Sequence, residues 1–266
     1  MTQNVLITGA STGIGRALAL DYGRQGARIW LLARSSDRLQ VLAGEIRDAG
    51  GEATVLAGDL TDTDVMLKHL EQAEMESGGM DLVIANAGFS GRMRYPGADN
   101  VKIARHTLRL NFEAAVLCLE FFAQKMIPRH RGILVGIGSI AGYRGLPGSA
   151  PYSSTKAALH TYLESLRFSM KPYGIQVTDI RPGFVATPLV AHNRQFMPFI
   201  MSAEAASVRI RKAIARRRKR FTFPWPMALV GHLIHALPDF VTDWLLAIVM
   251  KQRSIEGPPK DDDPRL

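Results

Sequence analysis

The sequence contains a single cysteine, Cys118, among its 266 residues. One cysteine cannot form an internal disulfide, and it cannot supply a cysteine-based zinc site. The chain therefore fits a reducing compartment, and we expect a cytoplasmic protein without a metal centre.

A long apolar run is also missing. The longest stretch without a charged residue, 221–238, contains Pro224, Pro226 and Pro238, and it is shorter than the about 20 mainly apolar residues of a membrane-spanning helix. The apolar residues 5–7 lead directly into a glycine-rich turn, so they are too few for the core of a signal peptide. We predict no membrane-spanning helix and interpret residues 5–8 as a first strand.

The composition is that of a globular protein with an uneven charge. Apolar residues make up 47% of the chain and charged residues 21%, which excludes a disordered protein. The net charge is +9, and many of the cations fall between 209 and 220, where no acidic residue occurs. Such a run is typical of a solvated helix face, although it also fits contact with an anionic membrane. No recognition motif accompanies the arginines, so we expect no nucleic-acid partner.

Strands and helices alternate up to about residue 188. Short apolar runs predict strands at 5–8, 28–33, 53–57, 81–85, 132–137 and 175–180. Helical patterns cover 14–25, 36–49, 62–76, 103–127 and 152–171. Short apolar strands that alternate with helices predict a parallel sheet buried on both faces. We therefore expect a single doubly wound α/β (Rossmann) domain with helices on both faces, and no further alternation after residue 188.

A glycine-rich turn follows the first predicted strand. Residues 8–15 read TGASTGIG. Glycines allow a tight turn and let the backbone approach a pyrophosphate at the N-terminus of the next helix. A plain glycine-rich loop is the alternative, but the position between the first strand and the first helix favours a dinucleotide site. The turn lacks the Gly-Lys-Ser/Thr of a P-loop.

The end of the second predicted strand indicates which dinucleotide binds. An acidic residue roughly 20 positions after the glycines binds the ribose 2′-hydroxyl, whereas an arginine accommodates a 2′-phosphate. Here the uncharged Ala33 is followed by Arg34. We predict NADP(H) as the cofactor; the alternative is that Arg34 only ends the strand in solvent.

Three polar residues form a candidate catalytic set. Ser139 follows the predicted strand 132–137, and Tyr152 and Lys156 are four positions apart on one helix face. A free tyrosine has a pKa of about 10, and a nearby lysine ammonium and a cationic nicotinamide favour its phenolate. A Tyr-x-x-x-Lys pair alone is usually structural, but downstream of a nucleotide turn it indicates catalysis.

Together these motifs resemble the short-chain dehydrogenase/reductase family, from residue 5 to about 189. The matching motifs are residues 8–15, Asp59-Leu60, Asn86-Ala87-Gly88, Asn111, Ser139, Tyr152, Lys156 and residues 181–187. The resemblance implies that Tyr152 exchanges a proton with the substrate and that Lys156 binds the nicotinamide ribose and lowers the pKa of Tyr152. It also implies that Ser139 orients the reacting oxygen and that Asn111 holds a water linking Lys156 to solvent.

A cofactor-binding set follows from the same resemblance. Asp59 and Leu60 face the adenine in this pattern, and the Val185 backbone and Thr187 bind the carboxamide. The full predicted set is Gly9, Ser11, Gly13, Ile14, Gly15, Arg34, Asp59, Leu60, Asn86, Ala87, Gly88, Tyr152, Lys156, Pro182, Gly183, Val185 and Thr187. Ala85 departs from the family, which often has a second asparagine there.

The C-terminal third carries no family motif. We expect residues 189–224 to form a substrate lid and a basic segment of the same domain, since their apolar content fits the wall of an apolar pocket as well as ordinary packing. Residues 225–256 predict amphipathic helices, which fit an interfacial membrane anchor within 209–250 or packing on the core or a partner subunit. Residues 257–266 predict a disordered tail.

The sequence thus predicts an NADP(H)-dependent oxidoreductase that interconverts an apolar carbonyl compound (a ketone, aldehyde, steroid or lipid-like molecule) and its alcohol. Residues 1–188 would be the dinucleotide-binding and catalytic core. The alternative is a non-catalytic dinucleotide-binding or membrane-associated scaffold protein with the same fold. The resemblance also implies a homodimer or homotetramer, because the family commonly pairs the helices that carry Asn111 and Tyr152.

Overall fold

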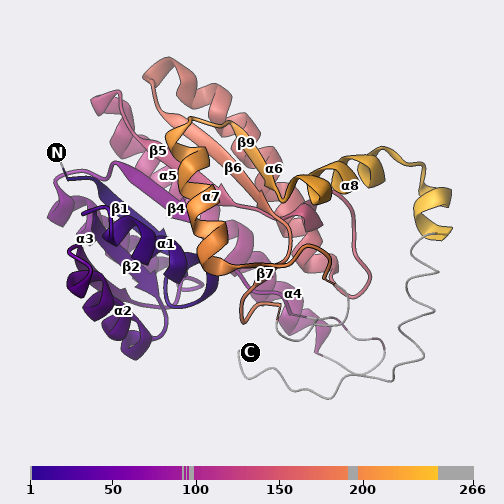
Figure 1. Ribbon diagram of the computed structural model, residues 1–266, viewed down its shortest axis with the longest axis horizontal. Coiled ribbons are helices and arrows are strands. Elements are labelled where there is room, and N and C mark those ends of the chain that lie inside the picture. Colours follow the sequence, from indigo (N-terminus) through magenta and orange to yellow (C-terminus); the bar gives the residue numbers. More distant parts are fainter. Residues whose placement is uncertain (1, 92, 94, 96–98, 191–196, 245–266) are drawn as a thin grey trace.

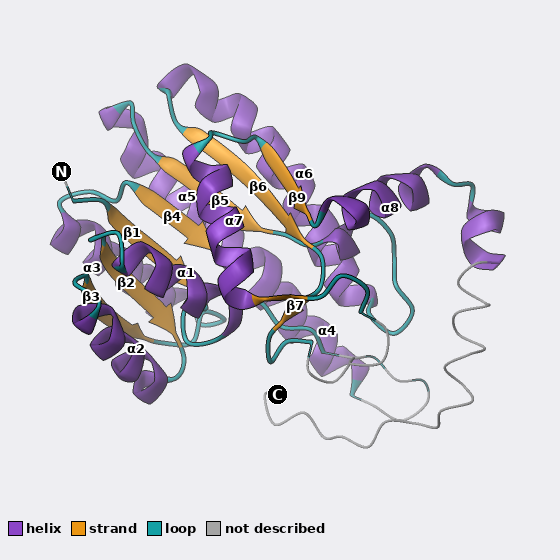
Figure 2. Cartoon of the chain, in the orientation of Figure 1, coloured by secondary structure: helices purple, strands orange, loops and turns teal. Residues whose placement is uncertain are grey.

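The computed structural model describes residues 2–91, 93, 95, 99–190 and 197–244. Its centre is a seven-stranded parallel sheet with the strand order β3-β2-β1-β4-β5-β6-β9 (Figures 1 and 2). The strands are β1 (Asn4–Thr8), β2 (Arg28–Ala33), β3 (Glu52–Ala57), β4 (Leu82–Ala85), β5 (Ile133–Ile137), β6 (Gln176–Pro182) and β9 (Arg220–Phe223). The predicted doubly wound α/β fold is confirmed.

Helices cover both faces of the sheet (Figure 2). One face carries α1 (Gly13–Gly23), α2 (Ser36–Asp48) and α7 (Ala203–Ala215), and the other carries α3 (Thr63–Ser77), α5 (Ala114–Met126) and α6 (Ala150–Met170). Val5 and Ile7 of β1 belong to one apolar core, whereas Leu6 between them belongs to the other. This burial on both faces explains why the strands appear in the sequence as continuous apolar runs.

The chain reverses direction across the sheet at β1. β1 lies between β2 and β4, so the first two crossovers build one half of the sheet and the later ones build the other. Ligands of open α/β sheets bind at this reversal, beyond the carboxyl ends of the strands. The residues that follow β1, β4, β5 and β6 therefore meet at one edge.

The alternation does not stop at residue 188, and that part of the sequence-based prediction is wrong. After a short pair of strands, β7 (Val185–Ala186) and β8 (Met201–Ser202), α7 packs against α1 and β9 pairs in parallel with β6. Ile210 and Ile214 of α7 are buried, and Arg211 forms an ion pair with Asp21 of α1 at 2.9 Å. The basic segment 209–220 is thus partly a core helix, which carries Arg209, Arg211 and Lys212, and partly the turn 216–219 and the start of β9.

The predicted helix 103–127 is interrupted. It consists of α4 (Asn100–Leu108), a π-helical turn (Arg109–Glu113) and α5. A π-helical turn inserts an extra residue into the helical ladder and is frequent at functional sites. Asn111 lies in this turn and is fully buried.

After β9 the chain forms α8 (Trp225–Ala236), which extends away from the sheet (Figure 1). A further helical stretch begins at 239. Within the described residues, no helix is both long enough and apolar enough to cross a membrane. Three parts of the sequence-based predictions lie outside the described residues: the lid residues 191–196, the end of the second amphipathic helix from 245 to 256, and the tail 257–266.

Candidate active site

A cavity of about 720 Å³ lies at the carboxyl ends of the strands. It is lined by most of the predicted site residues, namely Gly9, Ser11, Gly13, Ile14, Arg34, Asp59, Leu60, Asn86, Ala87, Gly88, Ser139, Tyr152, Lys156, Pro182, Gly183, Val185 and Thr187. Gly15 and Asn111 do not line the cavity and lie behind its wall. The structure therefore brings the two predicted sets together in one space.

The glycine turn is shaped by close backbone contacts. Gly9 and Gly13 have φ angles of +65° and +56°, which L-residues rarely adopt. A Cβ on Gly9 would lie 2.7 Å from Ala87 Cα, and a Cβ on Gly15 would overlap the Gly9 carbonyl. Gly15 is therefore required for packing inside the turn, while the other two shape its surface.

Asn86 fixes this turn to the end of β4. Its side-chain amide donates to the carbonyl oxygens of Thr8 at 3.0 Å and Gly9 at 3.2 Å. In return, the Thr8 hydroxyl accepts from the backbone N–H groups of Asn86 and Ala87 at 3.0 and 3.1 Å. These bonds join the carboxyl end of β1 to the carboxyl end of β4.

One end of the cavity carries two arginines. Arg34, in the bend after β2, and Arg38, in the first turn of α2, are exposed and both line the cavity. In the described part of the chain, neither guanidinium forms an ion pair with a carboxylate. Only Arg34 was predicted; the signal that would have added Arg38 is its place in the first turn of the helix that follows the second strand.

His106 of α4 lines the same end and was not predicted. Its Nε2 is buried and has no hydrogen-bond partner among the described residues, and its ring packs edge-on against Phe89 at 4.9 Å between centroids. Burial, followed by the charge of Arg34, lowers the pKa of His106, and the carboxylate of Asp59 partly opposes this. Asp59 itself accepts two hydrogen bonds from Thr61.

The catalytic candidates meet at the ends of β5 and α6. Burial raises the pKa of Tyr152, and a hydrogen bond with Ser139 partly offsets that rise. Lys156 Nζ lies 5.7 Å from the centre of the Tyr152 ring and donates to the Ile137 carbonyl at 2.8 Å. Burial lowers the pKa of Lys156 to about 8, against the opposing charge of Asp179. A hydroxyl, a phenol and an ammonium thus share one wall of the cavity.

Asn111 acts on the backbone rather than on the cavity. Its amide donates to the Phe89 carbonyl at 2.9 Å and to the Thr155 hydroxyl at 3.3 Å, and its carbonyl oxygen accepts from the Phe89 N–H at 2.7 Å. These bonds fix the loop after β4 to α6. The predicted water relay from Asn111 to Lys156 stays a prediction.

The other end of the cavity is apolar. Its side chains come from the region after β6 and from α8: Phe184, Leu189, Val190, Phe199, Met227, Val230 and Ile234. The predicted lid thus contributes to the wall, and α8 contributes a second apolar face to it. Arg144, after the Ser139 turn, binds the Leu237 carbonyl at 2.9 Å and Asp239 at 2.8 Å. It thereby ties the segment after α8 to the site.

Comparison with known proteins bears directly on this geometry. The model of the short chain dehydrogenase family matches residues 3–198. The chain belongs to this family. Short-chain dehydrogenases are oxidoreductases that use nicotinamide dinucleotides, so the family resemblance drawn from the motifs is confirmed.

Relatives within the family cover most of the chain. An uncharacterized oxidoreductase of Myxococcus xanthus is 38% identical over 241 residues, which are 91% of this chain and 95% of that protein. The 11-beta-hydroxysteroid dehydrogenase-like 2 protein of Arabidopsis thaliana is 32% identical over 259 residues, 93% of this chain and 82% of that protein.

Solved structures give the same fold. A short-chain type dehydrogenase/reductase from Mycobacterium marinum is 26% identical, with a TM-score of 0.76 over 83% of this chain and 93% of that chain. An alcohol dehydrogenase from Thermococcus sibiricus, solved in complex with 5-hydroxy-NADP, has a TM-score of 0.75 over 84% of this chain and 96% of that chain. At 22% identity it shows a shared fold only.

Proposed function

We propose that this protein is an NADP(H)-dependent oxidoreductase that interconverts an apolar ketone or aldehyde and its alcohol. The observation that carries the proposal is one cavity in which a basic end, a catalytic wall and an apolar end lie together. Two arginines lie beside the glycine turn at one end, Ser139, Tyr152 and Lys156 form a wall, and apolar side chains close the other end.

The cofactor part rests on the arginine end. Guanidinium groups bind phosphate oxygens with paired, charge-assisted hydrogen bonds. Arg34 follows the end of β2, where an acidic residue would otherwise bind a 2′-hydroxyl, and Arg38 of α2 lines the same cavity. The buried Nε2 of His106, which has no partner in the described part of the chain, leaves a polar atom for the adenosine portion of the cofactor. These residues fit a dinucleotide with a 2′-phosphate.

The chemical part rests on three side chains. The dinucleotide, when bound, supplies or accepts the hydride. Tyr152 donates a proton to the carbonyl oxygen during reduction and removes it from the hydroxyl during oxidation. Ser139 orients that oxygen, and the ammonium of Lys156 stabilises the phenolate that Tyr152 becomes.

The substrate part rests on the apolar wall. Methionine and phenylalanine side chains adapt to apolar ligands of irregular shape, and Met227 and Phe199 are among those that line the cavity. The name of the Arabidopsis relative, a hydroxysteroid dehydrogenase-like protein, is consistent with an apolar alcohol or ketone.

A spectrophotometric panel tests the proposal. The protein is assayed with NADPH and with NADH against acetophenone, decanal and a ketosteroid, with pyruvate as the polar control. We expect at least one apolar carbonyl compound to be reduced, faster with NADPH than with NADH, and pyruvate to be left unchanged. Binding of NADPH without turnover of any compound would instead support the non-catalytic scaffold, and a preference for NADH would contradict the cofactor assignment.

A further inference from the structure

His160 lies behind the catalytic wall. It is on α6, one helical turn beyond Lys156 and two beyond Tyr152, and it is only 6% exposed. Its ring occupies the space between the glycines that flank the serine turn: a Cβ on Gly142 would lie 2.6 Å from the ring, and one on Gly138 would overlap it. The ring therefore fits against Ser139 only because both neighbours lack a side chain.

Both ring nitrogens of His160 face hydrogen-bond acceptors. Nε2 lies 2.9 Å from the carbonyl oxygen of Ser139, and Nδ1 lies 3.1 Å from Oδ1 of Asp179. A backbone carbonyl can only accept, and an ionised carboxylate can only accept. A neutral imidazole carries one N–H and satisfies one of these bonds, so both bonds together require the doubly protonated imidazolium.

Asp179 is held in its ionised form. Its Oδ2 accepts from Nε and Nη2 of Arg181, both at 2.7 Å. Burial alone would raise the pKa of Asp179, but the hydrogen bond from His160 and the charges of His160 and Arg181 together lower it. The groups around the imidazolium are thus Asp179 and Arg181 from β6, Lys156 from α6, and the ring of Tyr143, whose centroid is 6.3 Å away.

The serine turn is anchored at three consecutive residues. Lys156 donates to the Ile137 carbonyl, Gly138 donates its N–H to the Ile180 carbonyl at 2.7 Å, and His160 donates to the Ser139 carbonyl. The last of these bonds acts on the residue that carries the catalytic hydroxyl. The Ser139 carbonyl also accepts from the Gly142 N–H at 3.1 Å, and the Ser139 hydroxyl accepts from the Ala141 N–H at 3.1 Å. Those two bonds lie within the turn itself, whereas the bond from His160 ties Ser139 to α6, the helix that carries Tyr152, and its loss would remove that tie.

We propose that His160 is a positioning residue of the reaction: its imidazolium, held by Asp179, fixes the Ser139 carbonyl so that the serine hydroxyl stays directed at Tyr152. The role is indirect, since His160 does not line the cavity. This proposal goes beyond the proposed function, and its first test does not depend on any substrate.

That first test is ¹⁵N NMR of the histidine rings in the unmodified protein. A ring N–H in a hydrogen bond to a buried acceptor exchanges slowly with water. We expect one of the seven histidines to show two hydrogen-bonded ring N–H groups, and its signals to be absent from the His160→Gln variant. Seven rings without such a pair would overturn the proposal, whether or not the variant folds.

The second test is a pair of variants, assayed with the best carbonyl compound of the panel and therefore resting on the proposed function. In His160→Gln, one amide group cannot donate to both Ser139 and the Asp179 carboxylate. In the double variant His160→Gln/Asp179→Asn, the asparagine amide donates to the glutamine oxygen and leaves the glutamine N–H for Ser139. We expect kcat to fall at least about tenfold in the single variant, to recover in the double variant, and NADPH affinity to change less than about twofold in both.

Leu159→Ala is the matched control. Leu159 is a fully buried neighbour on α6 whose side chain has no hydrogen-bonding group. We therefore expect Leu159→Ala to lower thermal stability without changing kcat per folded molecule. If His160→Gln also lowers only thermal stability, or if the double variant is no faster than the single one, His160 is only structural. A parent protein without any turnover would fail the proposed function and leave the NMR result to decide on His160.

Discussion

Tyr152 is the residue on which the proposed chemistry most depends. Its buried phenol has a raised pKa, so it is protonated at neutral pH and suited to act as an acid. We expect Tyr152→Phe to lower kcat by about 10²–10⁴-fold while NADPH binding is retained, as measured by initial rates and by fluorescence titration. Tyr162→Phe is the control, because Tyr162 is on the same helix but binds Glu120 at 2.8 Å, away from the cavity. Activity within about tenfold of the parent would contradict the assignment.

Lys156 predicts the pH dependence. Its pKa is lowered to about 8 by burial, so the ammonium is present below this pH and is lost above it. Because the ammonium stabilises the phenolate of Tyr152, the initial rate of reduction should be level below about pH 8 and fall above it. In Lys156→Arg the cation persists to much higher pH, so the variant should be slower but should lack this fall. An identical midpoint in the two pH–rate profiles would show that another group titrates.

Arg34 predicts the cofactor preference. Arg34→Ala removes a charge-assisted hydrogen bond to a 2′-phosphate, worth about 1.5–3 kcal/mol, so the Kd of NADPH should rise about ten- to hundredfold while that of NADH stays the same. We expect Arg38→Ala to act in the same direction. Arg24→Ala, at the exposed end of α1, is the control. Equal losses of both cofactors would make Arg34 structural.

The sequence predicts the site residues that belong to local patterns. The glycine turn, the Tyr152–Lys156 pair and Ser139 stand at fixed spacings within single elements, so they are visible without a structure. His106 and His160 are not, because their surroundings come from other elements: the partners of His160 are 19 and 21 positions away in the chain. The roles of these residues arise only from tertiary contacts.

Among the helices and strands too, those with a clear local apolar pattern were predicted, and those without one were missed. Strands β1, β2, β4 and β5 are almost wholly buried and mainly apolar, so their sequences predict the sheet. β3 at the edge is only partly buried, and β6 carries the buried Thr178, Asp179 and Arg181 among its apolar residues. α7 carries three cations and four more follow it at 216–219, while β9 has only four residues. The positive charge therefore obscures the apolar pattern of this helix and this strand. The π-helical turn at Asn111 was missed because its apolar pattern continues that of the helices on either side.

β9 yields a stability prediction. Phe223 is 1% exposed and stacks on Phe221 with 5.2 Å between ring centroids. We expect Phe223→Ala to lower the free energy of unfolding by about 3–5 kcal/mol, as measured by urea denaturation. Trp225→Ala is the matched aromatic control, since Trp225 is 76% exposed and its loss should cost less than about 0.5 kcal/mol. Equal effects would contradict the placement of β9 in the sheet.

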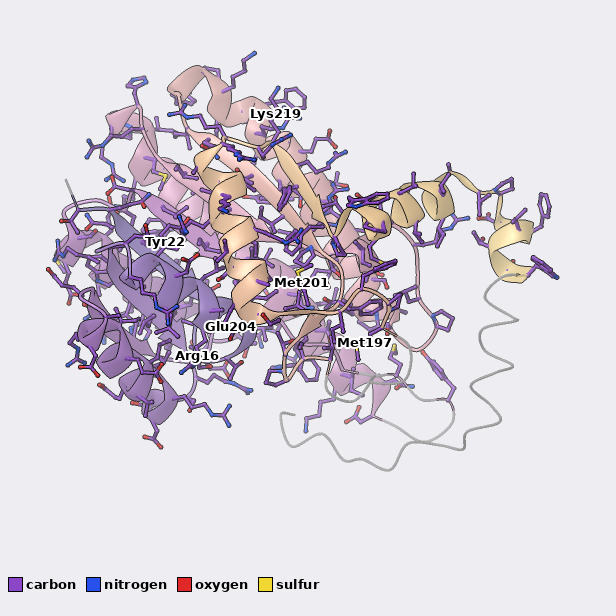
Figure 3. The ribbon with its side chains drawn as sticks, in the orientation of Figure 1. Arg16, Tyr22, Met197, Met201, Glu204 and Lys219 are labelled. Carbon is purple, nitrogen blue, oxygen red and sulfur yellow. The ribbon has the colours of Figure 1, made fainter. Side chains whose placement is uncertain are left out.

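At the scale of the whole molecule, β9 separates the cations of 216–219 from the apolar helix α8, which are close together in the sequence. Figure 3 shows Glu204 at one end of α7 and Lys219 beyond the other end. From there β9 runs back along the sheet, and its four residues, at about 3.3 Å each, place the cations of 216–219 about 13 Å from the start of α8. The described residues of 225–244 contain two aspartates and no lysine or arginine. The basic turn 216–219 and the apolar helix α8 thus lie at opposite ends of β9.

α8 is apolar on two sides. Met227 and Ile234 line the cavity, while Trp225, Leu229 and Leu233 are exposed. We propose that this outer side of α8 contacts a lipid surface, which would bring an apolar substrate next to the wall of its own cavity. Because no cation in this helix takes part, the attraction would come from apolar burial rather than from the charge of the lipid headgroups.

Co-sedimentation with vesicles tests this proposal. We expect the protein to sediment with both zwitterionic and anionic vesicles at 0.1 M salt and to remain bound at 1 M, where the Debye length has fallen from about 10 to about 3 Å. Leu229→Asp/Leu233→Asp should abolish binding, whereas Arg217→Ala/Arg218→Ala should not change it. Binding to anionic vesicles alone that disappears at high salt would assign the contact to the basic turn instead. A protein that stays in the supernatant throughout, and whose oligomer dissociates in the aspartate variant, would show that the outer side of α8 packs against a second copy of this chain.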